Sequence, residues 1–167
     1  MTTAKNNNRK MAYRIIILGG YGNFGARVAR ALASEPNIEL IVAGRDLGSA
    51  SRFVRTIGGA GAACEATGLD HTAYDFPANL HALRPNLVVH TSGPFQGQDY
   101  HVARVAIDAG AHYLDLADGR AFVAGIGVLD AAAREHGVVV ASGASTVPAV
   151  SSPVVDSMLR PWPRPEP

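Results

Sequence analysis

The residues with the clearest chemical meaning are six consecutive positions near the N-terminus. They read G-x-G-x-x-G and comprise Gly20, Tyr21, Gly22, Asn23, Phe24 and Gly25. The motif follows a β-branched run at residues 14–18 and opens a segment, 23–34, whose apolar residues have helical spacing. In that setting Gly20 permits a tight turn, Gly22 lets a pyrophosphate approach the backbone, and Gly25 lets the helix pack on the strand. Since free amides and the positive end of the helix dipole then face the phosphates, the pattern favours a dinucleotide site over a glycine-rich turn without a ligand.

The end of the second expected strand indicates which dinucleotide is bound. A site that prefers NAD usually carries Asp or Glu there, about 20 residues past the glycines, where the acid grips the ribose 2′-hydroxyl. Gly44 stands at that position and Arg45 follows it. A guanidinium can bind a 2′-phosphate through two parallel hydrogen bonds, so the pair favours NADP over NAD. Two alternatives stay open: Arg45 is a solvated turn residue, or a register error of one residue makes Asp46 the ribose ligand.

Residues for catalysis are harder to assign. The only lysines, Lys5 and Lys10, lie in the N-terminal tail, so a Tyr-x-x-x-Lys pair is impossible, and the six histidines lack metal-ligand spacing. Each histidine is expected to be structural, and His90 is the best exception because it ends a strand near the expected cleft. Asp115 and Asp118 could act as acid–base groups, although strand-end carboxylates more often cap a neighbouring turn. We therefore assign no catalytic residue and expect no metal.

Composition limits the class of protein. The chain has 167 residues, of which 47% are hydrophobic and 17% charged, with a net charge of +1. No apolar run approaches the roughly 18 residues of a membrane span, and residues 1–10 lack the apolar core of a secretory signal. A single cysteine, Cys64, excludes an internal disulfide and fits a reducing cytoplasm. Cations outnumber acids near the first strand, which suits a phosphorylated ligand, but no basic stripe with interleaved aromatics indicates nucleic-acid binding.

Strand-like and helix-like segments alternate along the chain. Strands are expected at 14–18, 38–43, 62–69, 87–90, 112–116 and 138–142, and helices at 23–34, 47–57, 74–83 and 98–109, with another ending at 136. This order predicts an α/β fold: a doubly wound, mainly parallel six-stranded Rossmann sheet with helices on both faces. The expected domain spans 13–146, between a disordered tail at 1–12 and a helical segment at 147–160. Residues 161–167 form a proline-rich tail.

These motifs together resemble the NADP-binding domain of the saccharopine dehydrogenase-like oxidoreductases. The resemblance runs from about Arg14 to Pro153. It rests on residues 19–25 and 43–45, on the loop Ser92-Gly93-Pro94-Phe95, and on the strand 112–116. It implies an NADP-dependent oxidoreductase in which the loop 92–95 lies beside the cofactor. One departure is the sequence 117–120, Ala-Asp-Gly-Arg, where the family commonly has Gly-Glu.

Family members also continue into a second domain that binds substrate and contributes to dimerisation. We expect this chain to bind the cofactor while the small-molecule substrate is held by a domain that is missing from it. The alternatives are a stand-alone module that senses NADP(H) and a dimer scaffold without catalysis. The substrate stays open among an amino acid, an imine and an enoyl group. Within 147–160, Val154, Val155, Met158 and Leu159 have the spacing of one apolar helix face, which predicts a homodimer unless the segment folds back on its own sheet.

Overall fold

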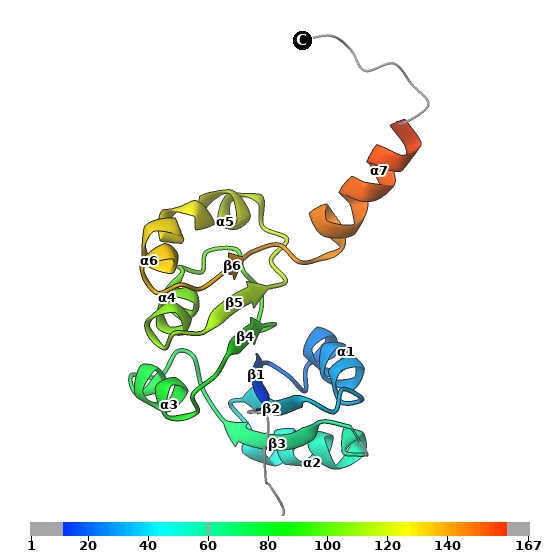
Figure 1. Ribbon diagram of the computed structural model, residues 1–167, viewed down its shortest axis with the longest axis vertical. Coiled ribbons are helices and arrows are strands. Elements are labelled where there is room, and N and C mark those ends of the chain that lie inside the picture. The colour runs from blue at the N-terminus through cyan, green and yellow to red at the C-terminus, as the bar shows by residue number, and fades with distance from the viewer. Residues whose placement is uncertain (1–11, 60, 160–167) are drawn as a thin grey trace, which may run out of the picture.

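The computed structural model describes residues 12–59 and 61–159, which form a six-stranded parallel sheet with helices on both faces (Figure 1). The strands are β1 (Tyr13–Leu18), β2 (Ile38–Gly44), β3 (Ala63–Gly68), β4 (Leu87–His90), β5 (His112–Asp115) and β6 (Val140–Ala141). Their order in the sheet is β3-β2-β1-β4-β5-β6. The predicted doubly wound Rossmann fold is confirmed.

Helices connect successive strands and continue past the last one. They are α1 (Asn23–Leu32), α2 (Leu47–Ile57), α3 (Phe76–Ala82), α4 (His101–Asp108), α5 (Arg120–Gly125), the 3₁₀ helix η1 (Ile126–Leu129), α6 (Asp130–Glu135), the π-helical turn η2 (Thr146–Val150) and α7 (Ser151–Leu159). Figure 1 shows α1 and α2 on one face of the sheet and α3, α4 and α6 on the other. Each face of the sheet is thereby covered.

The alternation of side chains along β1 builds one core on each face. Ile15 and Ile17 pack with residues of α1 and α2, whereas Ile16 and Leu18 pack with α3, α4 and α6. All four side chains are buried because β1 lies in the middle of the sheet, between β2 and β4. A strand covered on both faces needs an apolar residue at every position, which explains the continuous β-branched run in the sequence.

The chain reverses its direction across the sheet between β1 and β4. From β1 it proceeds outward to β2 and β3, then crosses back and proceeds from β4 to β5 and β6. The loops after β1 and β4 therefore leave neighbouring strands toward opposite faces. Such a switch point leaves a crevice at the carboxyl ends of the strands, which is where open α/β sheets bind their ligands.

Several element boundaries differ from those expected. The helix expected to end at residue 136 is divided into α5, η1 and α6, with Gly125 and Gly127 at the division. The helix expected from residue 98 begins at His101, because Gln98 turns inward to bond the preceding loop. The last strand is reduced to two residues. The expected tails at 1–12 and 161–167 lie outside the described residues, apart from Ala12.

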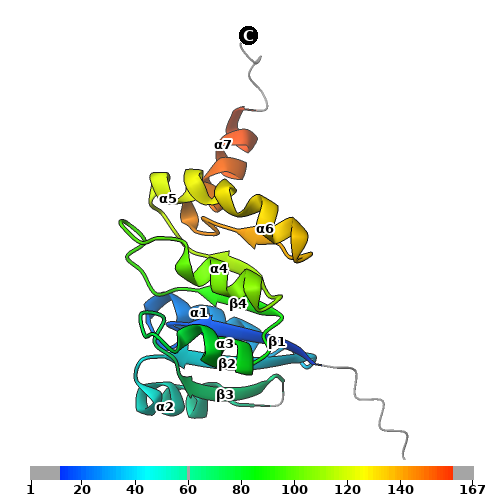
Figure 2. The same cartoon turned by 90° about the vertical axis from the view of Figure 1, so that its left-hand side faces the viewer.

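The C-terminal helix α7 extends away from the sheet (Figures 1 and 2). Val154, Val155 and Met158 on this helix are 48%, 50% and 68% exposed. The side chain of Leu159 is not among those described. The segment thus does not fold back on its own sheet. Within the described ranges no helix combines the length and hydropathy needed to cross a membrane.

Candidate functional site

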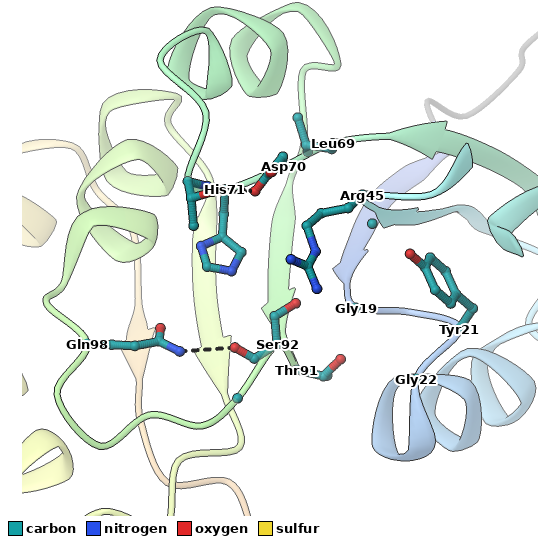
Figure 3. A pocket seen from close by; sticks show the side chains of 13 residues that line it. Gly19, Tyr21, Gly22, Arg45, Leu69, Asp70, His71, Thr91, Ser92 and Gln98 are labelled. Atoms are coloured by element: carbon teal, nitrogen blue, oxygen red, sulfur yellow. Dashed lines mark hydrogen bonds between the residues drawn. The ribbon is translucent and has the colours of Figure 1, made fainter. Parts of the chain in front are cut away.

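A cavity of about 380 Å³ lies at the carboxyl ends of β1 to β4, at the switch point (Figure 3). Five of the residues expected from the sequence line it, namely Tyr21, Gly22, Arg45, Ser92 and Gly93. The remaining expected residues do not line this cavity. Gly20 and Gly25 are buried within the glycine turn, and Asn23 is exposed at the start of α1. Phe24, Pro94 and Phe95 line a second cavity, described below. The structure therefore brings together the glycine turn, the end of β2 and the loop after β4.

Steric contacts distinguish the roles of the glycines in the turn. A Cβ added at Gly25 would lie 2.6 Å from the Thr91 hydroxyl oxygen and 2.7 Å from Gly20 Cα, and it would also overlap the Gly19 carbonyl oxygen. One added at Gly22 would meet only the Gly19 carbonyl oxygen, at 3.1 Å. Gly25 is thus needed for packing of α1 on the turn, whereas Gly22 is exposed beside the cavity.

The N-terminus of α1 opens beside this turn. Gly22 is its N-cap and supplies no side chain to bond the first amides. The first amides of a helix have no acceptor within the helix, and together with the dipole they attract an anion. The turn itself is held by the Ala43 carbonyl, which accepts hydrogen bonds from the Gly19 and Gly20 amides at 2.8 and 3.1 Å. These features fit a pyrophosphate at the start of α1.

Arg45 follows β2 and directs its guanidinium into the cavity, toward Ser92 and the loop after β3 (Figure 3). That loop contributes Asp70, His71 and Thr72 to the lining. The pKa of Asp70 lies below its usual value, chiefly because its carboxylate accepts hydrogen bonds from Thr72, and to a smaller extent because of the Arg45 charge. The Arg45 guanidinium, for which the sequence predicts a bond to a 2′-phosphate, therefore lies in the cavity.

Asp46, the alternative ribose ligand, is engaged elsewhere. Its carboxylate caps α2 by accepting hydrogen bonds from the Ser49 amide at 3.0 Å and the Ser49 hydroxyl at 2.8 Å. These bonds lower the pKa of Asp46. Its backbone amide donates to the Tyr21 hydroxyl at 3.0 Å. Asp46 therefore holds the turn that carries Arg45.

The loop after β4 forms the opposite wall of the cavity. The side-chain amide of Gln98 donates to the carbonyls of Ser92 at 3.1 Å and Pro94 at 2.6 Å, which fixes the loop (Figure 3). The Gly93–Pro94 peptide bond is cis. Phe95 is buried against Phe122, so it supports the loop from beneath. Gln98 was not anticipated from the sequence.

A smaller cavity of about 200 Å³ lies on the other side of this loop. The expected residues Phe24, Gly93, Pro94 and Phe95 line it, together with Thr91, Gln96, Leu116, Asp118 and Ser145. The Asp118 carboxylate accepts a hydrogen bond of 3.1 Å from the Gln96 amide. The site thus continues from the end of β3 across the switch point to the loops after β5 and β6.

His90 and Asp115 are both buried and form hydrogen bonds within the domain. His90 is buried and hydrogen-bonds to the Tyr113 hydroxyl at 3.1 Å. Burial, helped by the nearby His71, lowers the pKa of His90 from 6.5 to about 3, so the ring is neutral. Burial and the Asp115 charge raise the pKa of Tyr113. Neither His90 nor Asp115 lines the two cavities described above.

The Asp115 carboxylate caps the loops that follow β5 and β6. Its Oδ1 accepts hydrogen bonds from the Ala117 amide at 3.0 Å, the Ser142 hydroxyl at 2.9 Å and the Gly143 amide at 2.9 Å. The turn-capping interpretation of this residue is confirmed. In residues 12–59 and 61–159, no cluster of three or more His, Cys, Asp or Glu side chains could hold a metal ion.

Comparison with known proteins identifies the domain. A family model described as the saccharopine dehydrogenase NADP binding domain matches residues 15–141. The chain belongs to this family. NADP is therefore the cofactor of this domain, and the resemblance found in the sequence is confirmed. A search of curated proteins gives no significant match.

Solved structures share the fold of this NADP-binding domain. Apo saccharopine dehydrogenase (L-Glu forming) from Saccharomyces cerevisiae superposes with a TM-score of 0.70 at 18% identity, over 89% of this chain and 31% of that one. GenD2 from gentamicin A biosynthesis, in complex with NAD, has a TM-score of 0.55 at 23% identity, over 86% and 37%. A metagenomic short-chain oxidoreductase with NADP has a TM-score of 0.53 at 21% identity, over 79% and 80%. The chain thus spans about a third of the yeast enzyme.

Proposed function

We propose that this domain is the cofactor-binding part of an NADP-dependent oxidoreductase and that Arg45 selects NADP through its 2′-phosphate. The observation that carries the proposal is the Arg45 guanidinium in the cavity, directly after a glycine at the position where NAD sites bear an acid (Figure 3). The amides that begin α1 would hold the pyrophosphate. The exposed Gly22 leaves room for it.

The second cavity would accommodate the nicotinamide end of the cofactor. It adjoins the first cavity across Gly93 and is bounded by the loops after β4, β5 and β6. Bound NADPH supplies the hydride in oxidoreductases of this kind, and the protein supplies position and a dry environment. The loop 92–95, fixed by Gln98, would set the position of the ring. Phe24 and Phe95 would shield one side of it from water.

The substrate would be held by a further domain, as expected for a chain that spans about a third of the yeast enzyme. Asp118 and Ser145 are the polar residues of the second cavity closest in sequence to the ends of β5 and β6. We assign neither of them a catalytic role. Cytoplasmic location is proposed from the single cysteine, which leaves no internal disulfide.

We also propose that α7 mediates a homodimer. Val154, Val155 and Met158 leave an apolar surface on a helix that extends from the domain (Figure 2). Apolar surface of this kind is commonly covered by a partner. A second copy of α7, or the edge of the partner's sheet, would cover it.

Replacing Arg45 by alanine tests cofactor selection. The loss of a charge-assisted bond to the 2′-phosphate is worth about 1.5–3 kcal/mol, so Arg45→Ala should weaken NADPH roughly 10- to 150-fold in a calorimetric titration. NADH, which lacks that phosphate, should bind as before. Arg55→Ala, which removes an exposed cation from the other end of α2, is the matched control and should change neither affinity. Equal weakening of both cofactors by Arg45→Ala would overturn the assignment.

A further inference from the structure

The ring of Tyr21 occupies the space next to Gly44. A Cβ built at Gly44 would lie 2.5 Å from Cε1 of Tyr21 and 2.9 Å from both Cζ and the hydroxyl oxygen. Real side chains essentially never approach so closely, so any residue other than glycine at this position must displace the ring. Gly44 is the last residue of β2, where NAD-preferring sites carry the acid that binds the ribose hydroxyls.

Two contacts also hold the side chain of Tyr21 in place. The hydroxyl accepts the hydrogen bond from the Asp46 amide at 3.0 Å, and the ring packs against the core on the α1–α2 face. Asp46 in turn caps α2 through Ser49. The ring therefore connects the glycine turn to the turn that carries Arg45. Displacing it breaks the bond to Asp46.

From these contacts we infer that Tyr21 is a specificity-determining residue: it excludes an acidic ribose ligand at position 44 and holds the Arg45 turn toward a 2′-phosphate. The inference rests on the proposed selection of NADP by Arg45. Cofactor preference would then depend on a pair of residues, Tyr21 and Gly44, as well as on the arginine. An acid at position 44 could bind the ribose only after the ring has been removed.

A double-mutant cycle measured by calorimetry with NADPH and NADH tests the pairing. Gly44→Asp alone should weaken NADPH at least about tenfold and leave NADH no better than in the wild type, since the ring blocks the new carboxylate. In the Tyr21→Ala background the same Gly44→Asp change should strengthen NADH about tenfold. If Gly44→Asp changes the affinity for NADH by the same factor in the wild-type and Tyr21→Ala backgrounds, or changes it in neither, the inference is overturned.

The hydroxyl is tested separately by Tyr21→Phe, which keeps the ring. Losing the bond to the Asp46 amide should weaken NADPH about 2- to 10-fold while NADH changes less than twofold. Equal weakening of the two cofactors, or of neither, would refute the link to the Arg45 turn. Wild-type and Arg45→Ala titrations run in parallel. Failure of the wild type to bind NADPH would overturn the proposed function, whereas a wild type that depends on Arg45 but shows no coupling would overturn this inference alone.

Thermal unfolding without cofactor provides a measurement that does not need binding. Gly44→Ala adds one methyl group against the ring, so it should lower the melting temperature in the wild-type background. The same change should lower it much less in the Tyr21→Ala background, where the space is open. Equal shifts in the two backgrounds would show that the ring does not occupy position 44. This comparison remains available if an aspartate variant fails to fold.

Discussion

Replacing Asp115 should separate the capping role of its carboxylate from a role of its charge. All three donors, the Ala117 amide, the Ser142 hydroxyl and the Gly143 amide, bond to the same oxygen, Oδ1. The other oxygen, Oδ2, is buried without a hydrogen-bond partner in the described part of the chain. Asparagine can retain Oδ1 as an acceptor, whereas alanine removes it. The two variants should therefore differ strongly in stability.

The magnitude follows from what each variant leaves unpaired. Ala117 and Gly143 are buried, so Asp115→Ala strands two backbone amides away from water, each at about 1–3 kcal/mol. The expected loss is about 3–5 kcal/mol of unfolding free energy. Asp115→Asn loses only the charge assistance of these bonds, about 1 kcal/mol. At about 2–4 °C per kcal/mol for a chain of this size, alanine should lower the melting temperature by about 10 °C and asparagine by about 3 °C.

Urea unfolding followed by circular dichroism measures both variants against the wild type. Asp115→Ala should shift the midpoint strongly at an unchanged slope, and Asp115→Asn should fall between it and the wild type. If asparagine destabilises as much as alanine, the charge and not the acceptor geometry is required. If alanine remains within about 1 kcal/mol of the wild type, the three hydrogen bonds do not hold the loops after β5 and β6.

Three further predictions concern other parts of the molecule. Gly25→Ala should destabilise the fold by about 2 kcal/mol or more, because its methyl group overlaps the turn. Gly22→Val should abolish NADPH binding and leave the circular dichroism spectrum unchanged. The reverse pattern would contradict the roles assigned to the two glycines. His90 binds a proton near pH 6.5 in the unfolded chain and only near pH 3 in the folded chain, so the free energy of unfolding falls as the pH is lowered through this window. Between pH 7 and pH 5 the wild type should lose about 2 kcal/mol more of this free energy than His90→Asn. Equal losses in the two proteins would contradict the low pKa of His90. Light scattering at micromolar concentration should give a mass twice that of the 17.4 kDa chain. The double variant Val154→Asp and Met158→Asp should have the mass of a single chain. A monomeric wild type would refute the dimer.

Local sequence patterns predicted the fold well where one strand or helix determines its own environment. The helix 47–57 and the strand 87–90 have the bounds expected, because apolar spacing and flanking turn residues define both. The glycine turn could also be interpreted, because Gly22 and Gly25 both meet the backbone of Gly19 in the same short segment. Apart from the contacts of Gly20 with Val42 and of Gly25 with Thr91, these features depend on neighbours that are close in sequence.

The missed residues depend on contacts between distant segments. Asp70, His71 and Gln98 line the cavity only because β3 and β4 end at the same edge of the sheet as β1 and β2. A general rule, that loops at the carboxyl ends of strands form the site, could have directed attention to the loop after β3. No spacing in the sequence predicts that Tyr21 stands over Gly44, because their contact results from the pairing of β1 with β2.

Calorimetric titration of the wild-type chain with NADPH and with NADH measures whether the switch-point cavity binds a dinucleotide and prefers NADP. One NADPH should bind per chain, at an affinity at least about tenfold higher than that for NADH, because only NADPH offers a 2′-phosphate to Arg45. Equal affinities would contradict the selection of NADP by Arg45. An absence of binding by either cofactor would contradict the assignment of the switch-point cavity as a dinucleotide site.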